Sequence, residues 1–260
     1  MGKMPATGAD AVVIDLEDAT PPDGKAEGRE FAGRFVPELA PHLPVLLRIN
    51  DPSTDWYADD LAHLPPGLTA IVVPKVEKVD QLAGIVADLD RAGCECPIVA
   101  GIETALGVAD SRSLLMHPRV AAAYFGAEDF IADMGGVRSA TNAEVAMARS
   151  TVVLAARLGE VLALDQIVAD FHDDERFATE TSEARALGYH GKLCIHPAQV
   201  ALANRGFLPS DAEVQRAERL LAAYDEAKRQ GQASLAFEGQ MVDEPVAQQA
   251  RRLLAQADPS

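Results

Sequence analysis

The chain has 260 residues, 48% hydrophobic and 24% charged, a composition typical of an ordinary globular protein. A chain of this length can bury enough apolar surface to fold without disulfides or structural metals. The net charge of −17 disfavours nucleic acid as a partner, because an acidic surface repels phosphate backbones. No window approaches the roughly 18 apolar residues of a membrane helix, and no basic-plus-apolar leader opens the chain. We therefore expect a cytoplasmic protein without a membrane partner.

Short apolar runs recur along the first 200 residues and predict the strands of a parallel sheet. Each run is continuous rather than alternating in polarity, as in strands that are covered on both faces. Segments with helical spacing lie between them, including 79–91, 142–158 and 175–187, and this alternation is typical of a parallel α/β fold. The runs are residues 11–14, 45–47, 70–73, 98–102, 121–125, 162–168 and 189–195.

Each predicted strand ends on a polar or charged residue. In a closed barrel the carboxyl ends of all strands open on one face, where active sites lie. We therefore predict a (β/α)8 TIM barrel whose strand-end side chains converge on one mouth. A doubly wound sheet would favour a glycine-rich loop after the first strand, and residues 15–18 are acidic instead. The strand-end residues are Asp15, Arg48, Lys75, Glu103, Asp129, Asp165 and His196.

Seven strand runs are visible where a closed barrel needs eight, so the first strand is missing from this chain or the barrel is incomplete. We assign the barrel to residues 1–208 and a C-terminal helical extension, a tail or lid, to residues 209–260. Ser210 and Glu213 predict a capping box for a helix over 212–230, and a last helix is expected over 245–254. Unless the tail docks across a subunit interface, it is expected to expose Leu235, Phe237, Met241 and Val242.

Glu103 and Asp129 are the sharpest candidates for chemistry. They follow neighbouring strands, so their carboxylates are expected to lie close together. Mg²⁺ favours one or two protein carboxylates and completes its octahedron with water and substrate oxygens. We predict Mg²⁺ bound by Glu103 and Asp129, with Glu103 also close to the substrate. The alternative is that one of the two only pairs with Arg48 or Lys75.

Four further carboxylates make the predicted mouth acidic. Asp15, Glu17 and Asp18 follow the first strand, and Glu128 precedes Asp129. We expect some of them to bind metal-bound waters. A helix cap or a solvated charge is an equally open interpretation of each.

Two cations complete the candidate site. The planar guanidinium of Arg48 can hold a substrate carboxylate through two parallel hydrogen bonds, and its alternative is an ion pair with the nearby acids. Lys75 has the position of a Schiff-base lysine. Because metal ligands are present, a salt bridge is the better interpretation of Lys75.

Several motifs carry a family resemblance: residues 11–18 (AVVIDLED), 47–50 (LRIN), 73–75 (VPK), 101–104 (GIET), 125–129 (FGAED), 194–197 (CIHP) and 237–243 (FEGQMVD). Together and in this order they resemble the citrate lyase β-subunit and malyl-CoA lyase family. The resemblance covers nearly the whole chain. One departure is that such proteins usually open with a strand carrying an arginine and a proline–glycine turn, which this chain lacks.

The resemblance implies an eight-stranded barrel, Mg²⁺ on Glu103 and Asp129, and Arg48 on the carboxylate of a 2-oxo acid. It also implies that Asp243 reaches the mouth of a neighbouring subunit as the acid/base group, within a trimeric or hexameric homo-oligomer. The residues alone make Asp243 a helix N-cap ahead of Pro245.

The expected function is Mg²⁺-dependent cleavage or formation of a 3-hydroxy-3-carboxyacyl-CoA thioester of the citramalyl, malyl, citryl or hydroxymethylglutaryl type. The small-molecule partners are then a 2-oxo acid (or an acetoacetate-type product) and a CoA thioester. One alternative is a citrate lyase β subunit acting on an acyl-carrier-protein thioester. Two others are a metal aldolase acting on free hydroxy-oxo acids and a non-catalytic metabolite-binding barrel.

Overall fold

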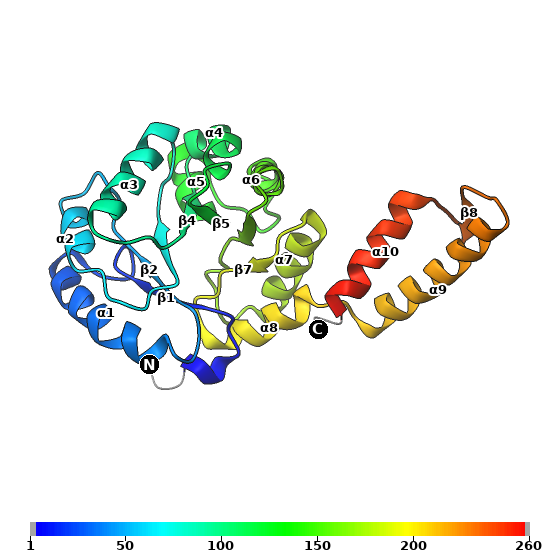
Figure 1. Ribbon diagram of the computed structural model, residues 1–260, viewed down its shortest axis with the longest axis horizontal. Helices are drawn as coiled ribbons and strands as arrows, with labels where there is room; N and C mark the ends of the chain where they lie inside the picture. Colours follow the sequence, from blue (N-terminus) through cyan, green and yellow to red (C-terminus); the bar gives the residue numbers. More distant parts are fainter. Residues whose placement is uncertain (1–3, 258–260) are drawn as a thin grey trace. The chain divides into compact units, whose positions relative to one another are not determined.

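The computed structural model describes residues 4–257, which form two compact units, residues 4–203 and 204–257 (Figure 1). Unit 1 contains one parallel sheet in which strands that follow each other in sequence are hydrogen-bonded neighbours. The strands are β1 (Val12–Asp15), β2 (Val45–Arg48), β3 (Ala70–Val73), β4 (Ile98–Ile102), β5 (Val120–Phe125), β6 (Leu162–Asp165) and β7 (Gly191–Lys192).

The apolar runs form strands because both faces of the sheet are covered. All residues of β3 and β4 are buried, and Ile71, Ile98 and Ile102 are fully enclosed. Removing each of these side chains from water contributes about 1.5 to 3 kcal/mol. The continuous apolar runs in the sequence of β3 and β4 therefore match the burial of every residue in these two strands.

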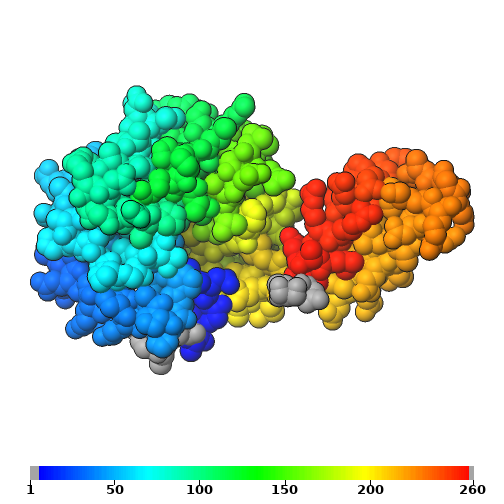
Figure 2. Space-filling view, viewed as in Figure 1, coloured from blue at the N-terminus to red at the C-terminus, as the bar shows by residue number. Residues whose placement is uncertain are grey.

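The helices of unit 1 alternate with the strands and surround them in Figure 1. In Figure 2 side chains fill much of the space between these ribbons. Short 3₁₀ segments cover Met4–Thr7 and Pro22–Gly24. The helices are α1 (Lys25–Leu39), α2 (Trp56–Ala62), α3 (Val79–Arg91), α4 (Ala105–Leu115), α5 (Ala127–Met134), α6 (Ala146–Gly159), α7 (Asp174–Leu187) and α8 (Pro197–Phe207).

The architecture is an α/β fold with the sequential parallel sheet of a TIM-like barrel. Within residues 4–257 the parallel sheet has the seven strands that the sequence predicts for this chain, one fewer than a closed eight-stranded barrel, and β1 and β7 lie at its edges. The predicted last strand, 189–195, is too long, since β7 pairs with β6 only at Gly191 and Lys192. Within the described chain, no helix combines the length and apolarity of a membrane crossing.

Unit 2 is built from two helices and a hairpin. The elements are α9 (Asp211–Arg229), β8 (Leu235–Phe237), β9 (Gln240–Val242) and α10 (Glu244–Ala257). The predicted capping box at the start of α9 is confirmed, because Ser210 Oγ accepts from Glu213 N and Glu213 Oε2 accepts from Ser210 N. The unit division at residue 203 falls inside α8, whereas the sequence suggested a boundary after residue 208.

The expectation that the tail exposes its apolar residues is wrong for most of them. Val242 is buried, and Leu235 and Phe237 pack against the same cluster, which Leu220 and Tyr224 of α9 line. Only Met241 remains largely exposed. The hairpin folds back on α9 and α10, so unit 2 has a small core of its own.

Candidate active site at the strand ends

Asp15 and Arg48 form the first pair of the site. They end β1 and β2 and face each other in the strand register. Arg48 Nε donates to Asp15 Oδ1 at 2.7 Å and Nη2 donates to Oδ2 at 2.5 Å. Burial raises the pKa of the Asp15 carboxyl, but the hydrogen bond and charge of Arg48 outweigh burial and leave this pKa below its usual value. The Nε–Nη2 edge of the Arg48 guanidinium group is therefore occupied by Asp15.

Glu17 lies between the two cations. Lys75 Nζ donates to its Oε1 at 2.9 Å, which confirms the ion pair expected of Lys75. Its Oε2 lies 2.9 Å from Arg48 Nη1 but outside hydrogen-bond geometry, so this buried atom makes no hydrogen bond. Burial raises the pKa of Glu17 in spite of both cations.

The turn that carries Glu17 is held by Lys25, which sequence reasoning missed. Lys25 Nζ is buried and donates to Leu16 O at 2.6 Å, Glu17 O at 2.7 Å and Asn50 Oδ1 at 2.7 Å. The sequence around Lys25 gives no sign of this role, because the partners of Lys25 come from the turns after β1 and β2. It satisfies carbonyl groups that would otherwise be buried unpaired.

Glu103 follows β4 and is only 2% exposed. Its Oε1 accepts from Lys75 N at 2.8 Å and from Tyr124 Oη at 3.1 Å. Burial raises the pKa of Glu103 to about 7; the Lys75 N–H lowers it and the negative charge of Asp129 raises it. Gly126 leaves room for Oε2, since a Cβ there would overlap this atom. Tyr124 is a further residue that the sequence did not single out, although a buried tyrosine hydroxyl needs a partner.

Asp129 lies in the first turn of α5, and Lys75 Nζ approaches its Oδ1 at 3.5 Å. Lys75 therefore touches both predicted metal ligands, through its backbone N–H and through its ammonium group. Asp133, one turn later on α5, accepts from Ala105 N at 2.8 Å. This bond joins the helix that carries Asp129 to the first residue of α4, two positions after Glu103.

The six residues Asp15, Glu17, Arg48, Lys75, Glu103 and Asp129 form what we call the strand-end site. Its four carboxylates face two cations, which leaves two negative charges uncompensated when all groups are ionised. In residues 4–257 no group of three or more His, Cys, Asp and Glu side chains could hold a metal. Glu103 and Asp129, whose negative charges act on each other, provide the one or two carboxylates that Mg²⁺ accepts when water and substrate supply its other ligands.

Other predicted residues lie outside these contacts. Asp18 is exposed and reaches Arg48 only at 4.0 Å, and Glu128 pairs with Arg138 at 3.0 Å. Asp165 was expected at the mouth, but it is fully buried between Arg149 and Lys192, which occupy both its oxygens. The remaining strand-end residue, His196, lies beyond the end of β7 and is exposed, with its ring stacked on Phe171.

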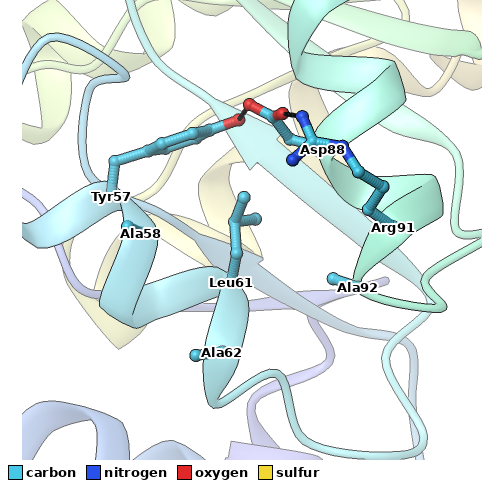
Figure 3. A pocket seen from close by; sticks show the side chains of 7 residues that line it. All are labelled: Tyr57, Ala58, Leu61, Ala62, Asp88, Arg91 and Ala92. Atoms are coloured by element: carbon cyan, nitrogen blue, oxygen red, sulfur yellow. Dashed lines mark hydrogen bonds and ion pairs between the residues drawn. The ribbon is translucent and has the colours of Figure 1, made fainter.

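A separate hollow lies between α2 and α3 (Figure 3). Tyr57 Oη donates to Asp88 Oδ2 at 3.2 Å, and Asp88 also pairs with Arg91. The polar groups at its rim are therefore satisfied by one another. The hollow includes none of the residues of the strand-end site.

Comparisons with known proteins show which proteins this chain resembles. The family model described as HpcH/HpaI aldolase/citrate lyase matches residues 1–197. The chain is 46% identical to a citrate lyase subunit beta-like protein of Deinococcus radiodurans, over 98% of this chain and 92% of that protein. It is 32% identical to a (3S)-malyl-CoA thioesterase of Cereibacter sphaeroides, over 98% and 89% of the two chains.

Among solved structures, the chain resembles protein CitE from Mycobacterium tuberculosis, determined with magnesium, acetoacetate and coenzyme A. The TM-score is 0.81 at 32% identity, and the match covers 97% of this chain and 91% of that one.

Proposed function

The chain belongs to the HpcH/HpaI aldolase/citrate lyase family, and from this premise we propose that its strand-end site cleaves or forms a 3-hydroxy-3-carboxyacyl-CoA thioester. The protein is a magnesium-dependent carbon–carbon lyase that acts on CoA thioesters. The observation that carries the proposal is the pair of carboxylates, Glu103 and Asp129, that share Lys75 as a neighbour in a site with excess negative charge.

Glu103 and Asp129 would hold Mg²⁺, which when bound acts as a Lewis acid on the substrate oxygens. In the cleavage direction the substrate hydroxyl would pass its proton to water and its oxygen would become the carbonyl of the 2-oxo acid. The carbon–carbon bond breaks, and the electron pair of that bond passes to the thioester enolate. Arg48 orients the 2-oxo acid carboxylate through Nη1, which lies 2.9 Å from Glu17 Oε2 without a hydrogen bond, and through the second hydrogen of Nη2, because Asp15 holds the Nε–Nη2 edge. The ion pairs of Arg48 with Asp15 and Glu17, and of Lys75 with Glu17, hold the two cations in place beside the proposed substrate site.

Asp243 is proposed as the group that protonates the enolate in cleavage and removes that proton in synthesis. It lies in unit 2, between β9 and α10, where Val246 N donates to its Oδ1 at 3.4 Å. We assign residues 1–208 to the catalytic barrel and 209–260 to the extension that supplies Asp243. In this proposal the extension serves the strand-end site of a neighbouring subunit in a trimer or hexamer.

The substrate class is tested with purified protein and Mg²⁺ against malyl-, citramalyl-, citryl- and hydroxymethylglutaryl-CoA. Lyase activity releases a 2-oxo acid (or acetoacetate) together with an acyl-CoA. Free CoA thiol without such a product would instead identify thioester hydrolysis, the activity in the name of the Cereibacter sphaeroides relative. Cleavage of only an acyl-carrier-protein thioester would support the citrate lyase subunit alternative.

Replacing Arg48 with lysine is expected to raise the KM for the 2-oxo acid by about tenfold or more, because a hydrogen bond to a charged group contributes about 1.5 to 3 kcal/mol. The melting temperature should change little, since lysine keeps a positive charge between Asp15 and Glu17. KM in the synthesis direction and thermal unfolding are the measurements. A collapse in melting temperature would show that Arg48 serves only the ion pairs.

The affinity for Mg²⁺ is expected to rise with pH and to level off above about 7. The pKa of Glu103 is raised to about 7, so below this pH the metal must displace a proton, at a cost of about tenfold in affinity per pH unit. The metal-free fold correspondingly loses stability as the pH rises from 4.5 toward 7, because the buried carboxyl must ionise. Calorimetric Mg²⁺ titrations between pH 5.5 and 8.5 test this. An affinity that does not vary with pH would contradict it.

A further inference from the structure

The turn between β3 and α3 contains a backbone conformation that the proposed function does not explain. Lys75 has a φ of 49°, in the left-handed region that side chains with a Cβ rarely adopt. In this conformation its N–H donates to Glu103 Oε1 while its Nζ reaches Glu17 and Asp129. One strained residue thus contacts three carboxylates of the strand-end site.

Both ends of the peptide group that follows Lys75 are fixed. Val76 N donates to Gly101 O at 3.0 Å, and Lys75 O accepts from Gln81 Nε2 at 3.2 Å. Because this peptide plane cannot rotate freely, the ψ torsion of Lys75, one of the two torsions that define its conformation, is held as well. Gln81 is the only side chain among these partners, so it is the one that substitution can remove cleanly.

Gln81 makes its bonds from the first turn of α3. Its Oε1 accepts from Glu77 N at 2.8 Å and from Lys78 N at 3.3 Å, which completes a capping box. A glutamate would serve that purpose equally well. The amide group adds the bond from Nε2 to Lys75 O, which a glutamate carboxylate cannot donate.

The turn between β7 and α8 contains the same arrangement away from the strand-end site. Gln199 Oε1 accepts from Ile195 N at 2.9 Å and from His196 N at 3.3 Å, and its Nε2 donates to Val168 O at 2.9 Å. Each glutamine therefore caps its helix with the oxygen and fixes a second backbone carbonyl with the nitrogen. Only at Gln81 does that carbonyl belong to a residue that contacts Glu103.

We propose that Gln81 is a positioning residue that holds Lys75 in its left-handed conformation, so that the Lys75 N–H orients the Glu103 carboxylate for a divalent cation. The inference rests on the proposed function, in which Glu103 binds Mg²⁺. Gln81 touches neither metal nor substrate and acts through the backbone of Lys75. Outer partners that orient metal ligands typically change metal affinity by roughly 10- to 100-fold when they are removed.

The test compares Gln81→Ala, Gln81→Glu and the matched control Gln199→Ala in the full-length protein at about pH 8, well above the usual pKa of a glutamate. Mg²⁺ affinity is measured by calorimetry, and amide hydrogen exchange of Lys75 is measured without metal. Both Gln81 variants should weaken Mg²⁺ binding roughly 10- to 100-fold and speed Lys75 exchange. Gln81→Glu should do so with a melting temperature near that of the wild type, because the cap survives. Gln199→Ala should change neither readout, although it also removes three hydrogen bonds.

Wild-type Mg²⁺ affinity and Lys75 exchange in Gln81→Glu would overturn the inference. An equal loss of Mg²⁺ affinity in Gln81→Ala and Gln199→Ala would also overturn it, because any weakened turn would then have the same effect. Glu103→Ala is titrated in parallel. Undiminished Mg²⁺ binding by that variant would reject the proposed metal site itself, and Lys75 exchange in the metal-free Gln81 variants would still report on the turn.

Discussion

Replacing Glu103 with alanine is expected to abolish Mg²⁺ binding and turnover while the fold survives. The carboxylate is one of only two proposed protein ligands, so its loss leaves Asp129 alone against a strongly hydrated ion. The substitution also removes the acceptor of the Lys75 N–H and the Tyr124 hydroxyl. Ionising a buried carboxylate is itself unfavourable, which limits the net loss of stability.

Calorimetry and thermal unfolding separate these effects. Glu103→Gln keeps an oxygen that can accept both hydrogen bonds but carries no charge, and it should lose Mg²⁺ binding as well. Glu180→Gln is the matched control, because Glu180 is an equally buried glutamate of unit 1 whose partners are Arg176, Gln166 and Lys192. It should bind Mg²⁺ like the wild type. Unchanged affinity in Glu103→Ala would remove Glu103 from the metal site.

Replacing Asp243 with asparagine should lower turnover by about 10² to 10⁴ and leave Mg²⁺ affinity unchanged, the range that general acid–base groups contribute. Asparagine is preferable to alanine here, because its side chain can still accept from Val246 N at the start of α10. The cap is kept while proton transfer is lost. Glu226→Gln, an exposed change on α9 of the same unit, is the control and should retain wild-type turnover.

Subunit mixing then tests whether the site is shared. An inactive Asp243→Asn protein is combined with an inactive Glu103→Ala protein under conditions that allow subunit exchange. Hybrid oligomers would contain some sites with both an intact Glu103 and an intact Asp243 from a neighbour, so part of the activity should return. If exchange is verified and no activity returns, Asp243 acts within its own chain or has no role in turnover.

The structure changes the basis of this shared-site proposal. Exposed apolar residues of the tail were expected to drive docking, yet Leu235, Phe237 and Val242 pack within unit 2. A pattern of apolar residues indicates burial but does not identify the surface that buries them. The proposed role of Asp243 therefore rests on the family resemblance rather than on a need to cover the tail.

The prediction that Asp165 lies at the mouth of the barrel was wrong for a similar reason, because the local sequence does not identify the partners of a side chain. A charged residue at a strand end is typical of an active site, and the local sequence around Asp165 looks no different from that around Asp15. Asp165 is instead neutralised by Arg149 on α6 and Lys192 on β7. Which cation meets which carboxylate depends on how the elements pack.

The sequence by itself determined the positions of most strands and helices, and it identified Glu103, Asp129, Arg48 and Lys75 as a group. It could do so because an apolar run and a helical period are local properties that burial imposes on neighbouring residues. Only the tertiary structure decided that Asp15 occupies one edge of Arg48, that Lys25 and Tyr124 bond to residues of the site or its turns, and that Gln81 Nε2 donates to Lys75 O. The Arg48–Asp15 and Tyr124–Glu103 contacts join residues 33 and 21 positions apart. All of these contacts depend on strand register, turn geometry or helix packing, for which the linear pattern contains no signal.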